Sequence, residues 1–241
     1  MEEKDKIKIW AISDTHCDHH RLIPPNPEEV DMVIHSGDAG GHRDLSINDG
    51  QMRSFLEWFN KLPYKHKVYV PGNHDTSVEA KFHNFKQDYP NITVLIHESI
   101  TLEGVNIFGS PYTPTFGHGW AYNVPRHKIS NYWEDIPLNT DIIVTHGPPK
   151  GILDYTIAHS NYYEKVGDKA LLNKVTEINP KYHIFGHLHD EGGVYNCGIF
   201  KPNQSGLKTE FVNACVKNLK YVNVNNGIYL EYDKGKQESA I

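Results

Sequence analysis

Five short polar blocks follow one another along this chain of 241 residues, and each contains side chains that can bind a metal ion. The blocks are Asp14-Thr15-His16, Gly37-Asp38, Gly72-Asn73-His74-Asp75, Thr145-His146-Gly147 and Gly186-His187-Leu188-His189. As ligands they offer two carboxylates, one amide oxygen and four imidazoles, which is enough for two neighbouring metal ions. Paired divalent metals of this kind attack phosphate esters with a metal-bound hydroxide. The blocks therefore predict a dinuclear phosphoesterase centre.

The blocks differ in how specific they are when each is taken alone. Gly37-Asp38 is typical of an ordinary turn, and an Asp-x-His triplet recurs by chance. Gly72-Asn73-His74 is the most specific, because glycine permits a sharp turn from which an amide and an imidazole emerge together. Nitrogen and oxygen ligands without a thiolate favour Mn, Fe, Zn or Ni over Cu(I) or an iron–sulfur cluster.

A short apolar run precedes each block, and its length and composition predict a buried strand. The runs are residues 7–12, 32–35, 68–70, 142–144 and 182–185. Ligands of open α/β sheets collect at the carboxyl ends of the strands. The residues alone therefore predict one sheet that brings all five blocks to a common edge.

Other segments predict what surrounds that sheet. Helical spacing of apolar residues is found in 49–62 (with Asp49 as the cap), 78–89 and 169–178. Alternating patterns predict β-structure over 91–111, turning at Glu103-Gly104, and over 211–232, turning at Asn225-Asn226-Gly227, which together would form a second sheet. The aromatic segment 111–137 favours a wall of a substrate cleft over a packed surface loop.

Composition sets the broad class of the protein. With 38% apolar and 22% charged residues, the sequence predicts one globular domain over residues 1–241, with a core from about 7 to 232 and a polar tail after 233. The net charge of −6 argues against a dedicated nucleic-acid binder.

The charged start of the chain and the lack of a long apolar segment predict a cytoplasmic protein without membrane contact. Cys17, Cys197 and Cys215 form no CxxC pair, which predicts reduced thiols.

The order and content of the blocks resemble the calcineurin-like metallophosphoesterase family. Further motifs resemble its metallophosphoesterase-domain branch, which includes class III cyclic-nucleotide phosphodiesterases: Gly109-Ser110-Pro111-Tyr112-Thr113-Pro114, Asn123-Val124-Pro125-Arg126, Thr145-His146-Gly147-Pro148-Pro149 and Phe211-Val212-Asn213-Ala214. The resemblance extends from about residue 7 to residue 232. It implies an α/β fold, a two-sheet β-sandwich flanked by helices on both faces (four layers, αββα).

The resemblance also implies a role for each ligand. One metal would be bound by Asp14, His16 and His189, the other by Asn73, His146 and His187, and Asp38 would bridge both. The cofactor would be two divalent ions, with Mn favoured and Fe, Zn or Ni as alternatives.

The catalytic histidine implied by the resemblance is His74, which would contact the phosphate and stabilise or protonate the leaving oxygen. Many family members continue the second block as Gly-Asp-x-x-Asp, and the last aspartate orients that histidine. This chain departs from the pattern with Gly37-Asp38-Ala39-Gly40-Gly41. Asp44 and Asp75 are both candidates to replace the missing aspartate.

The leading hypothesis for function is a metal-dependent phosphodiesterase that attacks small nucleotide-type phosphodiesters with a metal-bridging hydroxide. Cyclic 2′,3′- and 3′,5′-nucleotides are candidate substrates, and Asn73, His74 and Arg126 are the predicted substrate-binding residues. The alternatives are a nuclease and a non-catalytic scaffold. The predicted partner is a small phosphodiester, stable nucleic-acid binding is not expected, and the oligomeric state stays open.

Overall fold

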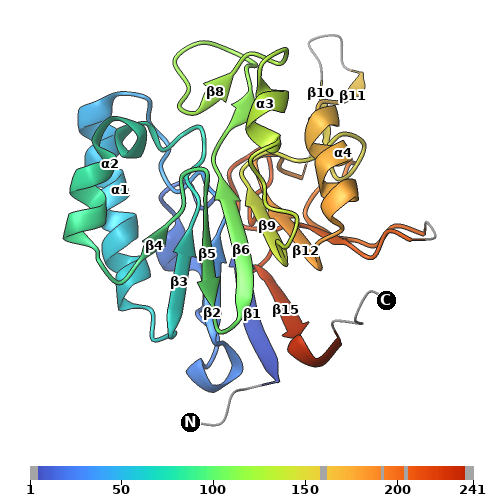
Figure 1. The fold of residues 1–241 in the computed structure, drawn as a ribbon. Coiled ribbons are helices and arrows are strands. Elements are labelled where there is room, and N and C mark those ends of the chain that lie inside the picture. The colour runs from blue at the N-terminus through green and yellow to red at the C-terminus, as the bar shows by residue number, and fades with distance from the viewer. Residues whose placement is uncertain (1–4, 158–161, 191–192, 204–205, 237–241) are drawn as a thin grey trace.

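The computed structural model describes residues 5–157, 162–190, 193–203 and 206–236, and these form two main β-sheets with helices outside both (Figure 1). In the first sheet the strand order is β15-β1-β2-β3-β4. Its four N-terminal strands run parallel, and β15 pairs antiparallel with β1 at one edge. The strands are β1 (Lys6–Ile12), β2 (Met32–His35), β3 (His66–Tyr69), β4 (Thr93–Val94) and β15 (Ile228–Asp233).

The second sheet has the strand order β13-β14-β12-β9-β6-β5. Its four inner strands are parallel, and the edge strands β13 and β5 are antiparallel to their neighbours. The strands are β5 (Glu98–Leu102), β6 (Val105–Ser110), β9 (Ile142–Thr145), β12 (Tyr182–Phe185), β13 (Gly198–Phe200) and β14 (Glu210–Asn213).

The helices cover the outer face of each sheet. Helices α1 (Leu45–Lys61) and α2 (Thr76–Asp88) pack on the first sheet, while α3 (Ile129–Trp133) and α4 (Lys169–Ile178) pack on the second. Figure 1 shows α1 and α2 on the opposite side of the molecule from α4.

Three apolar layers hold these elements together. The layer between the sheets joins residues such as Ile9 and Val68 of the first sheet to Ile142 and Ile184 of the second, all fully buried. The other two layers lie under the helices, one beneath α1 and α2 and one beneath α3 and α4. The two-sheet sandwich with helices on both faces is thus confirmed.

Shorter elements lie in the connections. Two small two-stranded sheets pair β7 (Thr113–Pro114) with β8 (Asn123–Val124) and β10 (Tyr155–Ile157) with β11 (Tyr163–Lys165). Short 3₁₀ helices span His19–Arg21, Pro27–Glu29 and Lys234–Lys236. Among the described residues, none of the helices combines the length and the apolar character that crossing a membrane requires.

Three predictions from the residues need correction. The five strands that precede the blocks do not form one sheet, because β1, β2 and β3 belong to the first sheet and β9 and β12 to the second. The segment 211–232 is not a hairpin, since β14 and β15 join different sheets. Helix α1 begins four residues before Asp49, because Asp44 caps it by accepting hydrogen bonds from the backbone of Ser46 and Ile47.

Other predictions are confirmed. The turn Glu103-Gly104 joins β5 to β6, and both residues have positive φ, 51° and 78°. The helix expected over 169–178 is α4, with Asp168 as its cap. The aromatic segment 111–137, by contrast, is not one long loop, because it contains β7, β8 and α3.

Candidate metal centre

The polar blocks leave the carboxyl ends of strands from both sheets and meet between them. Three blocks follow β1, β2 and β3 of the first sheet, and two follow β9 and β12 of the second. Backbone hydrogen bonds join blocks of the first sheet, such as Asp14 N to Gly37 O at 2.8 Å. Another joins the two blocks of the second sheet, from Gly186 N to His146 O at 3.0 Å.

Glycine is required where these blocks approach one another most closely. A Cβ on Gly72 would lie 2.3 Å from both the backbone nitrogen and Oδ1 of Asp38. A Cβ on Gly186 would lie 2.2 Å from Oδ2 of Asp14. Both distances are shorter than any van der Waals contact, so side chains at these positions would displace the ligands. This is the physical reason for glycine directly before Asn73 and His187.

Several ligands have strained backbone conformations. Asp14, His16, Asp38 and His187 have φ values of 56°, 41°, 56° and 70°, in the left-handed region that side chains rarely adopt. Each such residue costs on the order of 1–3 kcal/mol and persists only where the surrounding structure fixes it. Strain of this kind is concentrated at functional sites in proteins.

The first group of predicted ligands consists of Asp14, His16 and His189. Oδ1 of Asp14 lies 3.4 Å from Nε2 of His189 and 4.0 Å from Nε2 of His16. The two Nε2 atoms are 3.3 Å apart. The structure therefore brings together the three residues predicted to bind one metal, although 175 positions separate Asp14 from His189 (189 − 14).

The second group consists of Asn73, His146 and His187. Oδ1 of Asn73 lies 2.9 Å from Nε2 of His146, and the rings of His146 and His187 are 4.9 Å apart between centroids. The side chains of Asn73 and His146 are buried, with exposures of 1% and 0%. The three residues predicted to bind the other metal are thus also neighbours.

Asp38 lies between the two groups. Its Oδ2 is 4.0 Å from Nε2 of His16, whereas its Oδ1 is 3.3 Å from Nε2 of His146. Each carboxylate oxygen therefore faces a different group. Carboxylate, amide and imidazole donors gathered in this way fit divalent first-row metals.

Backbone carbonyls fix the orientation of three ligand imidazoles. Nδ1 of His16 lies 3.0 Å from Gly40 O, Nδ1 of His146 lies 2.9 Å from Ser36 O, and Nδ1 of His189 lies 3.2 Å from Asn218 O. A carbonyl oxygen can only accept, so each Nδ1 carries a proton and Nε2 is the atom that can bind a metal.

The electrostatic environment keeps most ligands ready for a cation. Burial lowers the pKa of His187 to about 3 and that of His16 to about 4, so both are neutral at pH 7. Burial also acts to lower the pKa of His146, but the charge and hydrogen bond of Asp38 outweigh it and raise that pKa to about 9. A metal ion that binds His146 must therefore displace a proton.

His74 is held beside the ligands by a main-chain group. Its Nδ1 lies 3.1 Å from Gly41 O, and its Nε2 lies 3.9 Å from Oδ2 of Asp38. Gly41 occupies the position of the last aspartate in Gly-Asp-x-x-Asp. A main-chain carbonyl thus accepts the hydrogen bond from Nδ1 and orients His74. The two aspartates considered as candidates to orient His74 have other partners.

Those aspartates stabilise the backbone instead. Asp44 caps α1, and Asp75 is fully buried at the start of α2. The Asp75 carboxylate accepts hydrogen bonds from Asp38 N, Gly40 N, Gly72 N and Tyr69 Oη at 2.7–3.0 Å. Burial, with the charge of Asp38, raises the pKa of Asp75 to about 6.

A cavity of about 230 Å³ opens over the ligands. Phe116 and Trp120 of the aromatic segment line it, together with Tyr155, Thr156, Leu219 and Tyr221. Among the described residues that line it, none is lysine or arginine.

The predicted substrate-binding Arg126 lies elsewhere. Its Nη2 donates to Val166 O at 2.7 Å, and it does not line the cavity. A different arginine is closer to the cavity wall, since the guanidinium of Arg43 lies 3.5 Å over the ring of Trp120.

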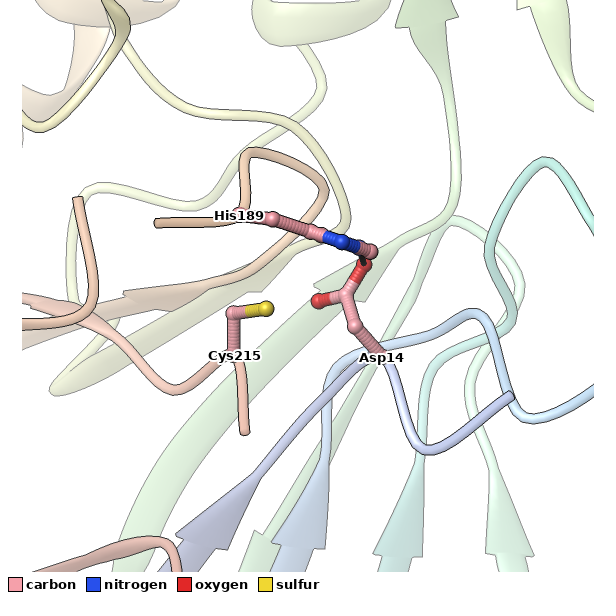
Figure 2. A group of neighbouring side chains, drawn as sticks. All are labelled: Asp14, His189 and Cys215. Carbon is pink, nitrogen blue, oxygen red and sulfur yellow. Dashed lines mark ion pairs between the residues drawn. The ribbon is translucent and has the colours of Figure 1, made fainter. Parts of the chain in front are cut away.

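Cys215 is a further neighbour of the centre that the sequence did not point to. Figure 2 shows the His189 ring directed at the Asp14 carboxylate, with Cys215 beside the pair. Its sulfur contacts the backbone of Lys217, accepting from N at 3.4 Å and donating to O at 3.5 Å. Burial, together with a hydrogen bond to Cys197, raises the pKa of Cys215 well above its usual value, so it remains a thiol.

Comparison with known proteins shows to which family the chain is similar. The calcineurin-like phosphoesterase family model matches residues 7–191. Metallophosphoesterase domain-containing protein 1 of Homo sapiens is 32% identical over 249 aligned residues, covering 93% of this chain and 70% of that protein. A UPF0046 protein of Caenorhabditis elegans is 32% identical, covering 86% of this chain and 69% of that protein. The crystal structure of TT1561 of Thermus thermophilus has a similar fold, with a TM-score of 0.55 at 15% identity over 87% of this chain and 89% of that one.

Proposed function

Because the chain belongs to the calcineurin-like phosphoesterase family, we propose that it is a dinuclear phosphodiesterase that hydrolyses small nucleotide-type phosphodiesters. The observation that carries the proposal is the position of Asp38. One of its oxygens faces Nε2 of His16 and the other faces Nε2 of His146, which supports a carboxylate that two cations would share. A site for one metal would need no such bridging ligand.

Two divalent cations, with Mn²⁺ favoured, would supply a nucleophile derived from water and neutralise charge on the phosphate oxygens. The remaining chemistry belongs to the side chains of this protein. The Nδ1–H group of His74 donates a hydrogen bond to Gly41 O, and Nε2 lies beside Asp38. From that position the Nε2–H group would donate its proton to the leaving oxygen. Asn73 and the imidazoles would hold the cations and so help to position the phosphate.

The first expected result concerns metal content. Reconstituted protein should hold two Mn²⁺ per chain, because the seven ligands divide into two groups that share Asp38. Elemental analysis after chelation and reconstitution with Mn²⁺ measures this. Asp44→Asn, which changes a helix cap outside the centre, should also hold two. A content that never exceeds one per chain in the wild type would refute the dinuclear site.

The second expected result concerns the substrate, and it separates a phosphodiesterase from a nuclease. A nucleotide diester carries one negative charge at its phosphate, which the cations balance. The described lining of the cavity has no lysine or arginine to hold further phosphates, and the net charge of −6 opposes a polyanion. Turnover of a 2′,3′- or 3′,5′-cyclic nucleotide should therefore exceed that of single-stranded DNA at equal phosphate concentration.

That comparison requires Mn²⁺-loaded protein at moderate salt, with chelated protein as the blank. Efficient cleavage of DNA with cyclic nucleotides left intact would reverse the order and favour the nuclease. Full metal content without hydrolysis of any diester would instead favour a non-catalytic scaffold.

A further inference from the structure

Residues 217–223 form a short hairpin beside the metal centre, beyond the residues that the family model matches. Lys217 and Asn223 form an antiparallel bridge across its base. Within it, Asn218 N donates to Val222 O at 3.0 Å and Tyr221 N donates to Asn218 O at 2.8 Å. The hairpin thus has a conformation fixed by its own hydrogen bonds.

Two contacts attach this hairpin to the centre. The amino group of Lys217 is fully buried, where it pairs with the Asp18 carboxylate and donates to Tyr221 O at 2.9 Å. The carbonyl of Asn218 accepts from Nδ1 of the ligand His189 at 3.2 Å. These contacts of Lys217 and Asn218 hold the hairpin, and with it Tyr221, beside His189.

Tyr221 places an aromatic ring over one group of ligands. Its ring centroid lies 4.9 Å from that of His16 and 5.5 Å from that of His189, both edge to face. The residue is nevertheless 51% exposed, and it lines the cavity. A ring that is held in place and still half open to solvent is available for contact with a ligand.

Two aromatic rings lie over the other side of the centre. Phe116 has its centroid 5.0 Å from that of His187, and Trp120 has its centroid 4.3 Å from that of His74. They come from the segment between β7 and β8 and line the same cavity as Tyr221. The cavity therefore has aromatic rings above both groups of ligands.

We propose that Tyr221 determines substrate specificity by stacking, together with Phe116, on a planar ring that remains attached to the phosphate. The favoured substrate is then an aryl or nucleoside phosphodiester rather than an alkyl one. This inference rests on the proposed function and adds to it the residue that recognises the group next to the phosphate. An aromatic ring gives a large contact area, and stacking accepts any flat ring because it uses no hydrogen-bond pattern.

The test uses two diesters that share one leaving group. Both p-nitrophenyl phenyl phosphate and ethyl p-nitrophenyl phosphate release p-nitrophenolate, so the ratio of their kcat/KM values isolates the retained group. Tyr221→Leu should lower the phenyl-to-ethyl ratio about ten-fold relative to wild type, as the loss of one stacking contact predicts. Tyr221→Phe keeps the ring and should keep the ratio.

The matched control is Tyr229→Leu, because Tyr229 on β15 is equally exposed (53%) but does not line the cavity. Its ratio should equal that of wild type. Should Tyr221→Leu not fold, Phe116→Leu supplies the same measurement from the other side, since Phe116 is 49% exposed. Thermal melting and Mn²⁺ content of each variant identify any loss of structure.

The outcomes separate this inference from the function on which it rests. The proposed stacking by Tyr221 and Phe116 would be overturned by an unchanged ratio in folded Tyr221→Leu, or in Phe116→Leu where that variant replaces it. An equal fall in Tyr229→Leu would overturn it as well. Failure of the wild type to hydrolyse either diester would instead contradict the proposed phosphodiesterase.

Discussion

Asp38→Ala is expected to reduce turnover of a phosphodiester more than loss of any ligand that belongs to one group alone. The substitution removes the carboxylate from between His16 and His146, so both cations of the proposed centre would lose a ligand and their mutual repulsion would no longer be offset. Loss of a partner behind a metal ligand already costs about 10- to 100-fold in affinity or activity. Loss of a ligand shared by two metals should exceed that range.

The measurement compares Asp38→Ala with His16→Ala at saturating Mn²⁺, with metal content determined for both. Asp38 also has a structural task, since its Oδ1 accepts a hydrogen bond from His74 N at 2.7 Å. Asp38→Asn keeps an acceptor at this position while it removes the charge, and it therefore separates the two effects. The bridging assignment fails if Asp38→Ala retains more activity than His16→Ala.

His74→Ala should lower turnover while metal content stays near that of wild type. The imidazole contacts Gly41 O and lies near Asp38, but its proposed task is performed on the leaving oxygen and not on a metal. Loss of a general acid costs about 10²–10⁴-fold. The loss should be smaller for esters of p-nitrophenol, because that leaving group departs without protonation.

The experiment is a comparison of diesters whose leaving groups differ in basicity, in wild type and His74→Ala. His83→Ala, which changes a histidine on α2 away from the ligands, is the matched control and should behave as wild type. An equal loss for good and poor leaving groups would show that His74 stabilises the phosphoryl oxygens and does not transfer a proton.

The apolar runs in the sequence predicted the strands but not the sheet to which each strand belongs. The strands before the five blocks were predicted from short apolar runs, and three of them, β2, β9 and β12, are buried along their whole length. That same property hides which sheet a strand joins, since β2 and β9 are equally buried but lie in different sheets. The resemblance to a known family supplied the two-sheet sandwich, whereas the residues alone predicted that all five strands share one sheet.

The site was predictable where side-chain type carries the chemistry. All seven proposed ligands lie together, and a carboxylate or imidazole is recognisable in the sequence. The groups that orient them are not, because Gly41 and Asn218 act through carbonyl oxygens that every residue possesses. Tyr221 was also missed, since a lone tyrosine in a β-like segment shows nothing of its position above His16.

Because the proposed ligands come from both sheets, metal binding at this centre would be thermodynamically linked to cohesion of the sandwich. Residues of the first sheet's blocks (Asp14, His16, Asp38 and Asn73) and of the second's (His146, His187 and His189) would share the same cations. Ions held in this way would act as a reversible cross-link between the two sheets. They would add about 2.7 kcal/mol to the free energy of unfolding at a free metal concentration one hundred times the dissociation constant.

The linkage also operates in reverse. Val68 and Ile142 pack in the apolar layer between the sheets, within their strands and outside the polar blocks. A smaller side chain at either position would weaken the packing between the two sheets. It would thereby lower metal affinity although no proposed ligand is changed. Metal affinity at the proposed centre would consequently depend on the whole sandwich, including the apolar layer between the sheets.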